Sequence, residues 1–452
     1  GLPYRVQLGE GLVGFEAALQ VGRATGPEGE VLGRDQIRAS NPPVFAASVV
    51  NPAYVGGSCV AADLTLERGA GPAYRAGCTL TREKRLPRTF GRDADWTIGG
   101  FDFGGELFVV GRLDGFDYAD ARALVDRGVD ADGTFPAGEW LCMEGADEAR
   151  GARDPECEYV TRRLAEIGAN AAWVSPFDGA LEGREVVAYL TGAADLRGAI
   201  DGLDYAPGAF VDNLTSLGAV PRNFSCDETG ETCPANEAQT SIARFVRAGA
   251  TAVHGTVAEP LNNSFPDAGA LLLYHEGYSL GESVLFAQEY LYWVNLVLGD
   301  PLTAPFATRP TVTVGDLVEG EPLVVTAEHP DGVGSVRLYA DGGLVEEAEG
   351  GSLAWVHGLP AATTVELRAV ATAATVLVGR PSWDPSVTPP TGWDQPDDDG
   401  QRVRPETEGW QVVEATIGAA VEPAACGCRS TGASGLLGWI LLLAWGRRRE
   451  VA

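Results

Sequence analysis

The order of apolar segments in this 452-residue chain predicts an α/β domain with a mostly parallel sheet, followed by a small β-sandwich. From about residue 105 to 300, short apolar runs of strand length alternate with longer segments whose apolar residues recur every three or four positions. After Pro305 the pattern changes to short runs in which apolar and polar residues alternate. With 45% hydrophobic residues, the chain can bury a large core and form two or more domains.

In the α/β region, short apolar runs predict five strands, and amphipathic segments predict four helices between and after them. Asp117 and Ser279 can accept hydrogen bonds from first-turn N–H groups, so we expect both to be N-caps. Residues 1–104 are less regular, and we expect mixed or β structure attached to the same core. The predicted strands are Leu107–Leu113, Ala171–Ser175, Glu185–Gly192, Gly208–Leu214 and Ala250–Gly255, and the predicted helices are Tyr118–Arg127, Glu156–Ile167, Thr240–Ala248 and Ser279–Leu298.

Residues 306–380 predict the β-sandwich, with a hairpin turn at Asp341-Gly342-Gly343. The runs VRLYADGGLV and LAWVHGLPAATTVELRAVA resemble bacterial immunoglobulin-like domains, a resemblance that implies a spacer or adhesive unit. Residues 381–425 are rich in Pro, Asp, Glu, Thr and Gly, which predicts a disordered acidic linker. The predicted strands of the sandwich are Thr311–Val314, Leu323–Ala327, Ser335–Tyr339 and Thr364–Thr372.

The net charge of -30 repels phosphate, so nucleic acid and anionic membrane surfaces are not expected as partners. The P-loop, HExxH and GxSxG signatures are missing from the sequence. The run Asp130-Ala131-Asp132-Gly133 begins like a calcium loop but lacks the rest of that pattern, and we interpret it as a turn. No metal and no cofactor is therefore predicted, and the ligand and oligomeric state stay open.

Six of the eight cysteines fall into close couples that bracket short polar stretches. This spacing suits loops closed by local disulfides in an oxidising compartment, and reduced buried thiols are the alternative. None of the couples has the spacing of a metal site. The couples are Cys59 with Cys78, Cys142 with Cys157, and Cys226 with Cys233.

The last 27 residues, 426–452, contain a Gly-Cys pair, an apolar run and three consecutive arginines. The run from Gly435 to Gly446 has 12 residues, whereas a normal membrane span needs about 20. Arginines held on the cytoplasmic side would leave the rest of the protein outside. The tail resembles the myxobacterial C-terminal sorting signal, with Gly427 and Cys428 as its Gly-Cys element and Arg447, Arg448 and Arg449 as its basic end.

That resemblance implies an exported protein of the cell envelope, anchored to the membrane through its C-terminal segment and recognised by a processing protease. A simple tail anchor without processing predicts the same topology. The chain begins at Gly1 without a leader, so we expect its true N-terminus to be missing.

Residues 1–305 resemble a family of exported bacterial proteins that is similar to caspase-like peptidases of the gingipain type. The resemblance implies a caspase-like sheet in which a His at the end of one strand and a Cys at the end of the next form a catalytic dyad. Here Thr191-Gly192-Ala193 stands in place of the His-Gly pair, and Thr215-Ser216 in place of the Cys. The resemblance rests on GLPYRV (1–6), GRLDG (111–115), GAFVDNLTSLG (208–218), RAGATAVHGTVAEP (247–260) and LGDPLTAP (298–305).

Other reactive side chains follow the same strands, where α/β sheets place their ligands. Ser216 as nucleophile, His254 as base and Asp212 as orienting carboxylate would meet a hydrolase template by residue type. The alternatives are that these residues are structural, or that acidic groups including Glu259 and Asp300 bind a ligand or metal. Three further histidines are expected to be non-functional: His275 in packing, and His329 and His357 on the sandwich surface.

We favour a catalytically silent α/β domain that serves as a binding or structural module at the cell surface. The alternative is a peptidase-like hydrolase with a non-standard Ser/His site.

Overall fold

The computed structural model describes residues 109–179, 181–220, 239–260, 265–288, 294–360, 362–374 and 407–417, with a few isolated residues and short strands elsewhere. The chain divides into two compact units, residues 1–309 with 374–407, and residues 310–373 with 408–452. Each unit is described by itself.

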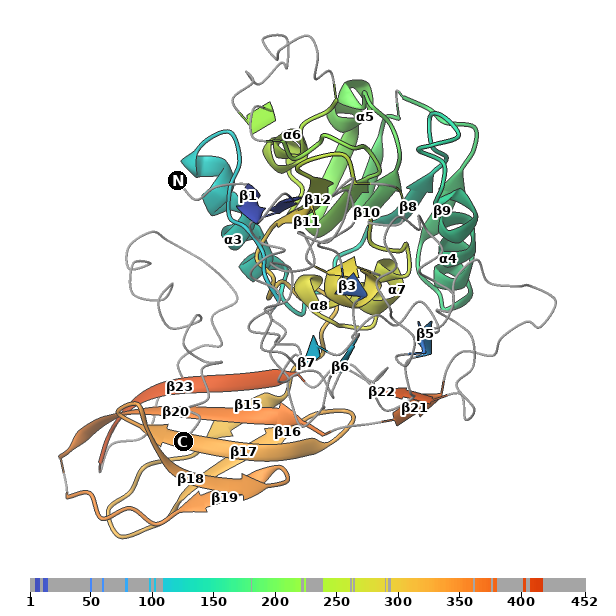
Figure 1. The fold of residues 1–452 in the computed structure, drawn as a ribbon. Helices are drawn as coiled ribbons and strands as arrows, with labels where there is room; N and C mark the ends of the chain where they lie inside the picture. The colour runs from blue at the N-terminus through green and yellow to red at the C-terminus, as the bar shows by residue number, and fades with distance from the viewer. Residues whose placement is uncertain are drawn as a thin grey trace. The chain divides into compact units, whose positions relative to one another are not determined.

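A six-stranded sheet forms the centre of the first unit (Figure 1). Its strand order is β14-β12-β11-β10-β8-β9, and every neighbouring pair is parallel except β12 with β14. The α/β domain with a mostly parallel sheet is thus confirmed. The strands are β8 (Glu139–Met143), β9 (Ala171–Val174), β10 (Arg184–Thr191), β11 (Leu203–Asn213), β12 (Ala252–Thr256) and β14 (Asn295–Leu298).

Helices cover both faces of this sheet (Figure 1). The central strands are buried on both faces because their alternate side chains enter two separate clusters of apolar residues. The first cluster packs under α4 (Asp154–Glu166), α7 (Ala270–His275) and α8 (Leu280–Ala287), and the second under α3 (Tyr118–Ala131), α5 (Arg197–Gly202) and α6 (Ile242–Ala248).

Both expected N-caps are confirmed. The Asp117 side chain accepts from the N–H groups of Ala119 and Asp120 at the start of α3. Ser279 and Glu282 form a reciprocal capping box at the start of α8.

The predicted helix Ser279–Leu298 is wrong beyond α8. The helix ends at Ala287, and Asn295–Leu298 instead forms edge strand β14, antiparallel to β12. The run YLYWVNLVL is apolar enough for a helix but rich in aromatic and β-branched residues, which favour strands.

The start of the sheet also differs from the prediction. Within the described part of Leu107–Leu113, the chain makes only a bridge between Arg112 and Leu298. Strand β8 was missed because EWLCM is short and carries no β-branched residue.

The second unit contains two antiparallel sheets, of order β15-β16-β19 and β18-β17-β20-β23, around one apolar core (Figure 1). This arrangement is a small β-sandwich, and the immunoglobulin-like resemblance stays a prediction. The strands are β15 (Thr311–Val314), β16 (Leu323–Glu328), β17 (Val333–Ala340), β18 (Gly343–Glu349), β19 (Ser352–Trp355), β20 (Thr364–Ala373) and β23 (Glu408–Thr416).

Strand β23 corrects the boundary between the predicted sandwich (306–380) and linker (381–425). It pairs with β20 along its length, and Val413, Ala415 and Ile417 enter the core. These residues alternate with polar ones, as expected of a strand. The strand was not predicted because the residues on either side of it have the composition of a linker. Within the predicted linker, β22 (Gln401–Val403) also pairs with β21 (Leu377–Gly379). His357, expected at the surface, is buried beside Trp355.

Short strands also pair within residues 1–104 and with one later segment. They are β1 (Arg5–Leu8) with β2 (Gly11–Gly14), β3 (Val49–Val50) with β13 (Tyr290–Leu291), β4 (Cys59–Val60) with β5 (Cys78–Thr79), and β6 (Thr97–Ile98) with β7 (Phe101–Asp102). Cys226, Cys233 and the whole predicted tail, residues 426–452, lie outside the described residues. Among the residues that are described, no helix has the length and hydropathy of a membrane span.

Candidate functional site

The predicted site residues lie on or just after two neighbouring parallel strands, β11 and β12. Parallel pairing places Asp212 of β11 directly opposite His254 of β12. Both side chains point to the same face of the sheet because they occupy equivalent positions of neighbouring strands. The register alone therefore brings this Asp and His together.

A buried polar network joins these two residues to Arg153 and Asn295. Arg153 Nη1 donates to Asp212 Oδ2 at 2.5 Å, and Asp212 Oδ1 lies 2.9 Å from His254 Nδ1. On the other side of the ring, His254 Nε2 lies 3.1 Å from Asn295 Oδ1. The His254 ring has 0% exposure and meets Phe265 edge-on at 5.3 Å. Both imidazole nitrogens are thus engaged inside the protein.

The ionised carboxylate of Asp212 neutralises a buried guanidinium. Burial opposes ionisation of Asp212, but Arg153 and then His254 outweigh it, so the pKa of Asp212 lies below its usual range. Burial would likewise lower the pKa of Arg153, yet the charge of Asp212 raises it instead. Arg153 also donates to the carbonyl oxygen of Pro266 at 2.9 Å, which ties the pair to the segment before α7. The ion pair is therefore charged and satisfied.

The hydrogen bonds also restrict the tautomer of His254. The Asp212 carboxylate can only accept, so Nδ1 carries a hydrogen. In the neutral ring Nε2 is then an acceptor, and a half-turn of the Asn295 amide presents its NH₂ group as the donor. In this arrangement His254 has no free nitrogen with which to accept a proton from a substrate or nucleophile.

Ser216 does not join this network. Its Oγ donates to Glu259 Oε1 at 3.0 Å, in an exposed position after the end of β11. The structure brings together Asp212 and His254 of the predicted Ser-His-Asp set and places Ser216 on a different carboxylate. A hydrogen bond from β12 holds the segment that contains Ser216, since Thr256 Oγ1 donates to the Ser216 carbonyl oxygen at 2.8 Å.

The two strand ends that correspond to the family's dyad are adjacent, because Thr191 of β10 pairs with Asn213 of β11. The loop 144–153, which connects β8 to α4, covers them. Ala146 N–H donates to the Gly192 carbonyl oxygen at 2.7 Å, and Arg150 Nε lies 3.5 Å from Thr215 Oγ1. A Cβ atom at Gly192 would lie 2.1 Å from the Arg150 carbonyl oxygen, so no side chain fits there.

Three residues important for this arrangement were missed from sequence. Arg153 and Asn295 complete the buried network, and the Asn213 side chain both accepts from Ala193 N–H and donates to its carbonyl oxygen. Asn213 had a usable signal, a polar side chain directly after a strand. Arg153 had none, because it precedes a helix far along the chain from its partner.

The other acidic and histidine candidates are separate from this network. Asp300 fixes its own turn by accepting from Leu302 N–H, and burial raises its pKa. His275 stacks on Phe306 as expected of a packing residue. His329 Nδ1 accepts from Asp331 N–H. Across the described residues, no group of three His, Cys, Asp or Glu side chains is arranged to hold a metal ion.

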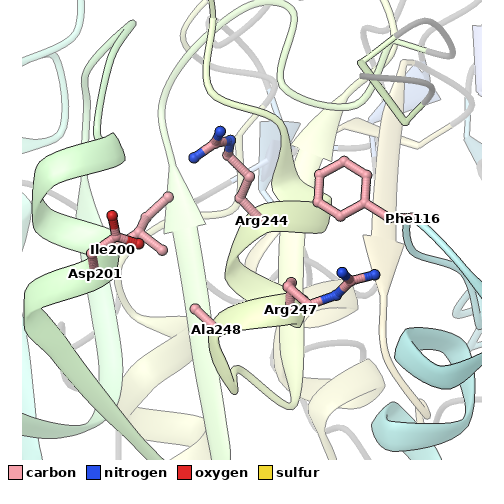
Figure 2. Close-up of a pocket in the computed structure, with 6 residues that line it drawn as sticks. All are labelled: Phe116, Ile200, Asp201, Arg244, Arg247 and Ala248. Atoms are coloured by element: carbon pink, nitrogen blue, oxygen red, sulfur yellow. The ribbon is translucent and has the colours of Figure 1, made fainter. Parts of the chain in front are cut away.

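Figure 2 shows a hollow on the α6 side of the sheet, lined by Phe116, Ile200, Asp201, Arg244, Arg247 and Ala248. Arg247 donates to Asp117 and Asp120 at 2.6–2.8 Å and lies over the Phe116 ring at 5.5 Å. These contacts anchor the start of α3, so the arginine already has a structural role.

The cysteines differ from the expected loop positions where the structure describes them. Cys142 lies on buried strand β8 and Cys157 on the buried face of α4, and both are free thiols. Cys59 and Cys78 are register partners in the pairing of β4 with β5. For the couple Cys142 and Cys157 the structure thus has the alternative, reduced buried thiols, and the other two predicted bonds stay predictions.

No family model matches the sequence, and no curated protein matches it either. The chain is similar to a structure of the complex of Porphyromonas gingivalis RgpB pro- and mature domains, with 13% identity and a TM-score of 0.33, over 58% of this chain and 74% of that one. It is also similar to the Arg-specific cysteine proteinase gingipain R, with 14% identity and a TM-score of 0.31, over 57% and 71%. Likeness at this level assigns no activity, so the peptidase relationship rests on the sequence resemblance.

Proposed function

We propose that the α/β domain is a non-catalytic binding or structural module of an exported, surface-anchored protein. The observation that supports this most is the state of His254, whose two ring nitrogens are bonded to Asp212 and Asn295 inside the protein. A general base must reach the proton that it removes. A fully enclosed imidazole with two protein partners does not meet that requirement.

The covered strand ends support the same proposal. In α/β sheets, ligands bind in the crevice outside the carboxyl ends of the strands. Here the loop 144–153 lies against Gly192 and reaches Thr215, where the resemblance would place the dyad. A substrate backbone would have to displace this loop together with the Arg150–Asp147 ion pair that braces it.

A covalent probe of serine nucleophiles tests the proposal. We expect a fluorophosphonate to leave Ser216 unmodified after prolonged incubation, with peptide mapping by mass spectrometry as the readout. Ser216 that is phosphonylated in the folded protein, but not when the protein is unfolded before labelling, would contradict a silent domain. Labelling that persists in the unfolded chain would be chemical background, and the denatured control separates the two.

The second candidate is a hydrolase, favoured by one observation, the 3.0 Å hydrogen bond from Ser216 Oγ to Glu259 Oε1. In this reading Glu259, rather than His254, accepts the proton as Oγ attacks a carbonyl carbon. Replacing Glu259 with Gln would then abolish turnover, whereas replacing His254 with Asn would affect activity only as far as it affects folding.

The anchoring part of the proposal is supported by the tail sequence alone. Deleting everything after Glu422 should release protein into the medium, and removing Arg447–Arg449 should weaken retention, since those arginines stop transfer. If the tail is processed, Cys428→Ala should block maturation and leave export intact. Mass measurement of the C-terminal peptide checks this, because an intact arginine end on the mature surface protein would exclude processing.

A further inference from the structure

The four-stranded sheet of the second unit turns one face away from the core, and Figure 1 shows its strands β18, β17, β20 and β23 side by side. Strand β20 sends Leu367, Ala369 and Ala371 into the core, so the residues between them point outward. Thr364 Oγ1 lies 3.0 Å from Thr416 Oγ1, which shows that the outward positions of β20 and β23 share this face. The strand register therefore determines which outward side chains are neighbours.

Two neighbouring rows across these strands carry aromatic, aliphatic and arginine side chains. Trp410 is 41% and Leu344 53% exposed. Val370 points outward as well, yet it is only 5% exposed, so the side chains beside it cover it. We call the two rows the arginine–aromatic band. The first row is Leu344, Tyr339, Arg368 and Val412, and the second is Arg337, Val370 and Trp410.

Carboxylates border the arginine–aromatic band on both sides. On one side Glu366 and Glu414 are register partners, and both are exposed. Like charges directly opposite each other destabilise a sheet, and neither carboxylate forms an ion pair with a described residue. On the other side, Glu349 and Glu408 stand at the two ends of the next row. A cation placed between Glu366 and Glu414 would relieve a repulsion that is built into the fold.

The two arginines of the band differ in their contacts. Arg337 Nη2 donates to Glu408 Oε1 at 2.6 Å, so this guanidinium is tied to one of the bordering carboxylates. Arg368 is half-buried between Tyr339 and Val412 and forms no ion pair with a described residue. A guanidinium has five N–H donors in a fixed fork. Those of Arg368 can bind carbonyl oxygens of a chain laid across the sheet.

We propose that this face docks a protein segment with an apolar centre bordered by Lys or Arg. Trp, Tyr and Arg supply most of the binding energy at protein interfaces, which have an apolar centre and a polar rim. The acidic rows select a basic border, and the net charge of -30 attracts it from a distance. A second copy of this chain fits worse, because its own acidic rows would meet these. The proposal holds whether or not the α/β domain is catalytic.

The other sheet of the sandwich supplies a control surface. Its outward rows are Thr313–Thr326–Ser352 and Val324–Ala354, which hold neither an aromatic nor a charged side chain. Val324 is 46% exposed, close to the exposure of Leu344. Truncating either side chain changes the surface by a similar amount, but only Leu344 belongs to the arginine–aromatic band.

Fluorescence anisotropy of a labelled peptide, KKLLLLKK, with the full chain tests the proposal in physiological salt, where weak attraction to the general acidic surface is screened. We expect saturable binding. Leu344→Ser should weaken it about tenfold, and so should the double variant Glu366→Lys/Glu414→Lys, which reverses the charge of one acidic row. Val324→Ser should bind like the unaltered chain. All the substituted side chains are exposed, and unchanged melting temperatures confirm that the variants fold.

The peptides SSLLLLSS and EELLLLEE separate the parts of the proposal, and both should bind more weakly than KKLLLLKK. Equal binding of SSLLLLSS would overturn the basic border, and tighter binding of EELLLLEE would show that Arg368 selects an acidic segment instead. Absence of saturable binding, or equal binding by all the variants, would overturn the docking face itself. Sedimentation of the chain alone addresses self-association: a dimer that Leu344→Ser abolishes would identify a second copy as the occupant and overturn the proposed partner.

Discussion

Asp212 is expected to contribute strongly to stability, because it neutralises Arg153 where both side chains are buried. The side chains are 1% and 9% exposed in the ion pair. Asp212→Asn would leave the guanidinium buried without its counter-ion, which costs about 3–5 kcal/mol. We expect a corresponding fall in the free energy of unfolding, measured by urea denaturation near neutral pH.

Asp147→Asn supplies the control, since it breaks another Arg–Asp pair of the same length that is partly exposed, at 24% and 47%. Such pairs contribute up to about 1 kcal/mol. Similar losses for the two variants would show that Asp212 is not the counter-ion that the buried network requires.

Glu156 is expected to make the free energy of unfolding depend on pH. Burial, then Asp267 and Cys157, raises its pKa well above the usual value of a carboxyl group. The folded state therefore binds this proton more tightly than the unfolded chain does. The resulting stability is present below the unfolded pKa and is lost as the pH rises through the folded pKa.

Glu156→Gln should accordingly be more stable than the unaltered protein in mildly alkaline buffer, with the difference vanishing at acid pH. Thermal melts over a pH series measure this. Glu158→Gln, an exposed position on the same helix, should follow the unaltered protein throughout. A constant offset between Glu156→Gln and the unaltered protein at every pH would refute the titration of Glu156.

At the level of single residues, the contacts that could be predicted from the sequence are those between residues close in the chain or on neighbouring strands. Asp117 and Ser279 were recognised as caps because a cap and its N–H partners lie within three residues of one another. The pairing of Asp212 with His254 was also predictable, since both end neighbouring strands. Arg153 and Asn295 were not, because their partners lie 59 and 41 positions away, in contacts set only by packing.

Among the secondary-structure elements, β23 has the strongest consequence. It pairs with β20 over nine register positions, from Thr364↔Thr416 to Thr372↔Glu408. A chain ending at Gly379 should lose the cooperative unfolding of the second unit, whereas a chain ending at Val421 should keep it. Calorimetry of the two truncations checks this. A sandwich transition that survives the shorter truncation would show that β23 is dispensable.

The spacing of apolar residues predicted the element correctly only where it fitted either a helix or a strand, and not both. Val324 and Val325 lie on opposite faces of β16, and the alternation of its burial was plain in the sequence. The segment after Ser279 satisfied helical and strand patterns alike, so its apolar content could not locate the end of α8. Residues 295–298 form a strand because they pair antiparallel with β12, a contact that the local sequence does not reveal.

For the whole molecule, the α/β sheet and the following sandwich could be predicted from the change in pattern after Pro305. The closed carboxyl edge of the sheet could not, because it depends on the loop 144–153 meeting Gly192 without space for a side chain. A missing His and Cys predicted a silent domain from residue type alone. The hydrogen bonds on both ring nitrogens of His254 support that proposal.

Hydrolysis of a mixed peptide library by the purified full chain tests the non-catalytic proposal most directly. The library is incubated from acid to mildly alkaline pH, and new peptide ends are counted by mass spectrometry against the matched variants Ser216→Ala and Glu259→Gln. The account predicts that all three proteins leave the library uncut to the same background. Cleavage by the unaltered chain that both variants lose, with their melting temperatures unchanged, would contradict it and establish Ser216 as a nucleophile.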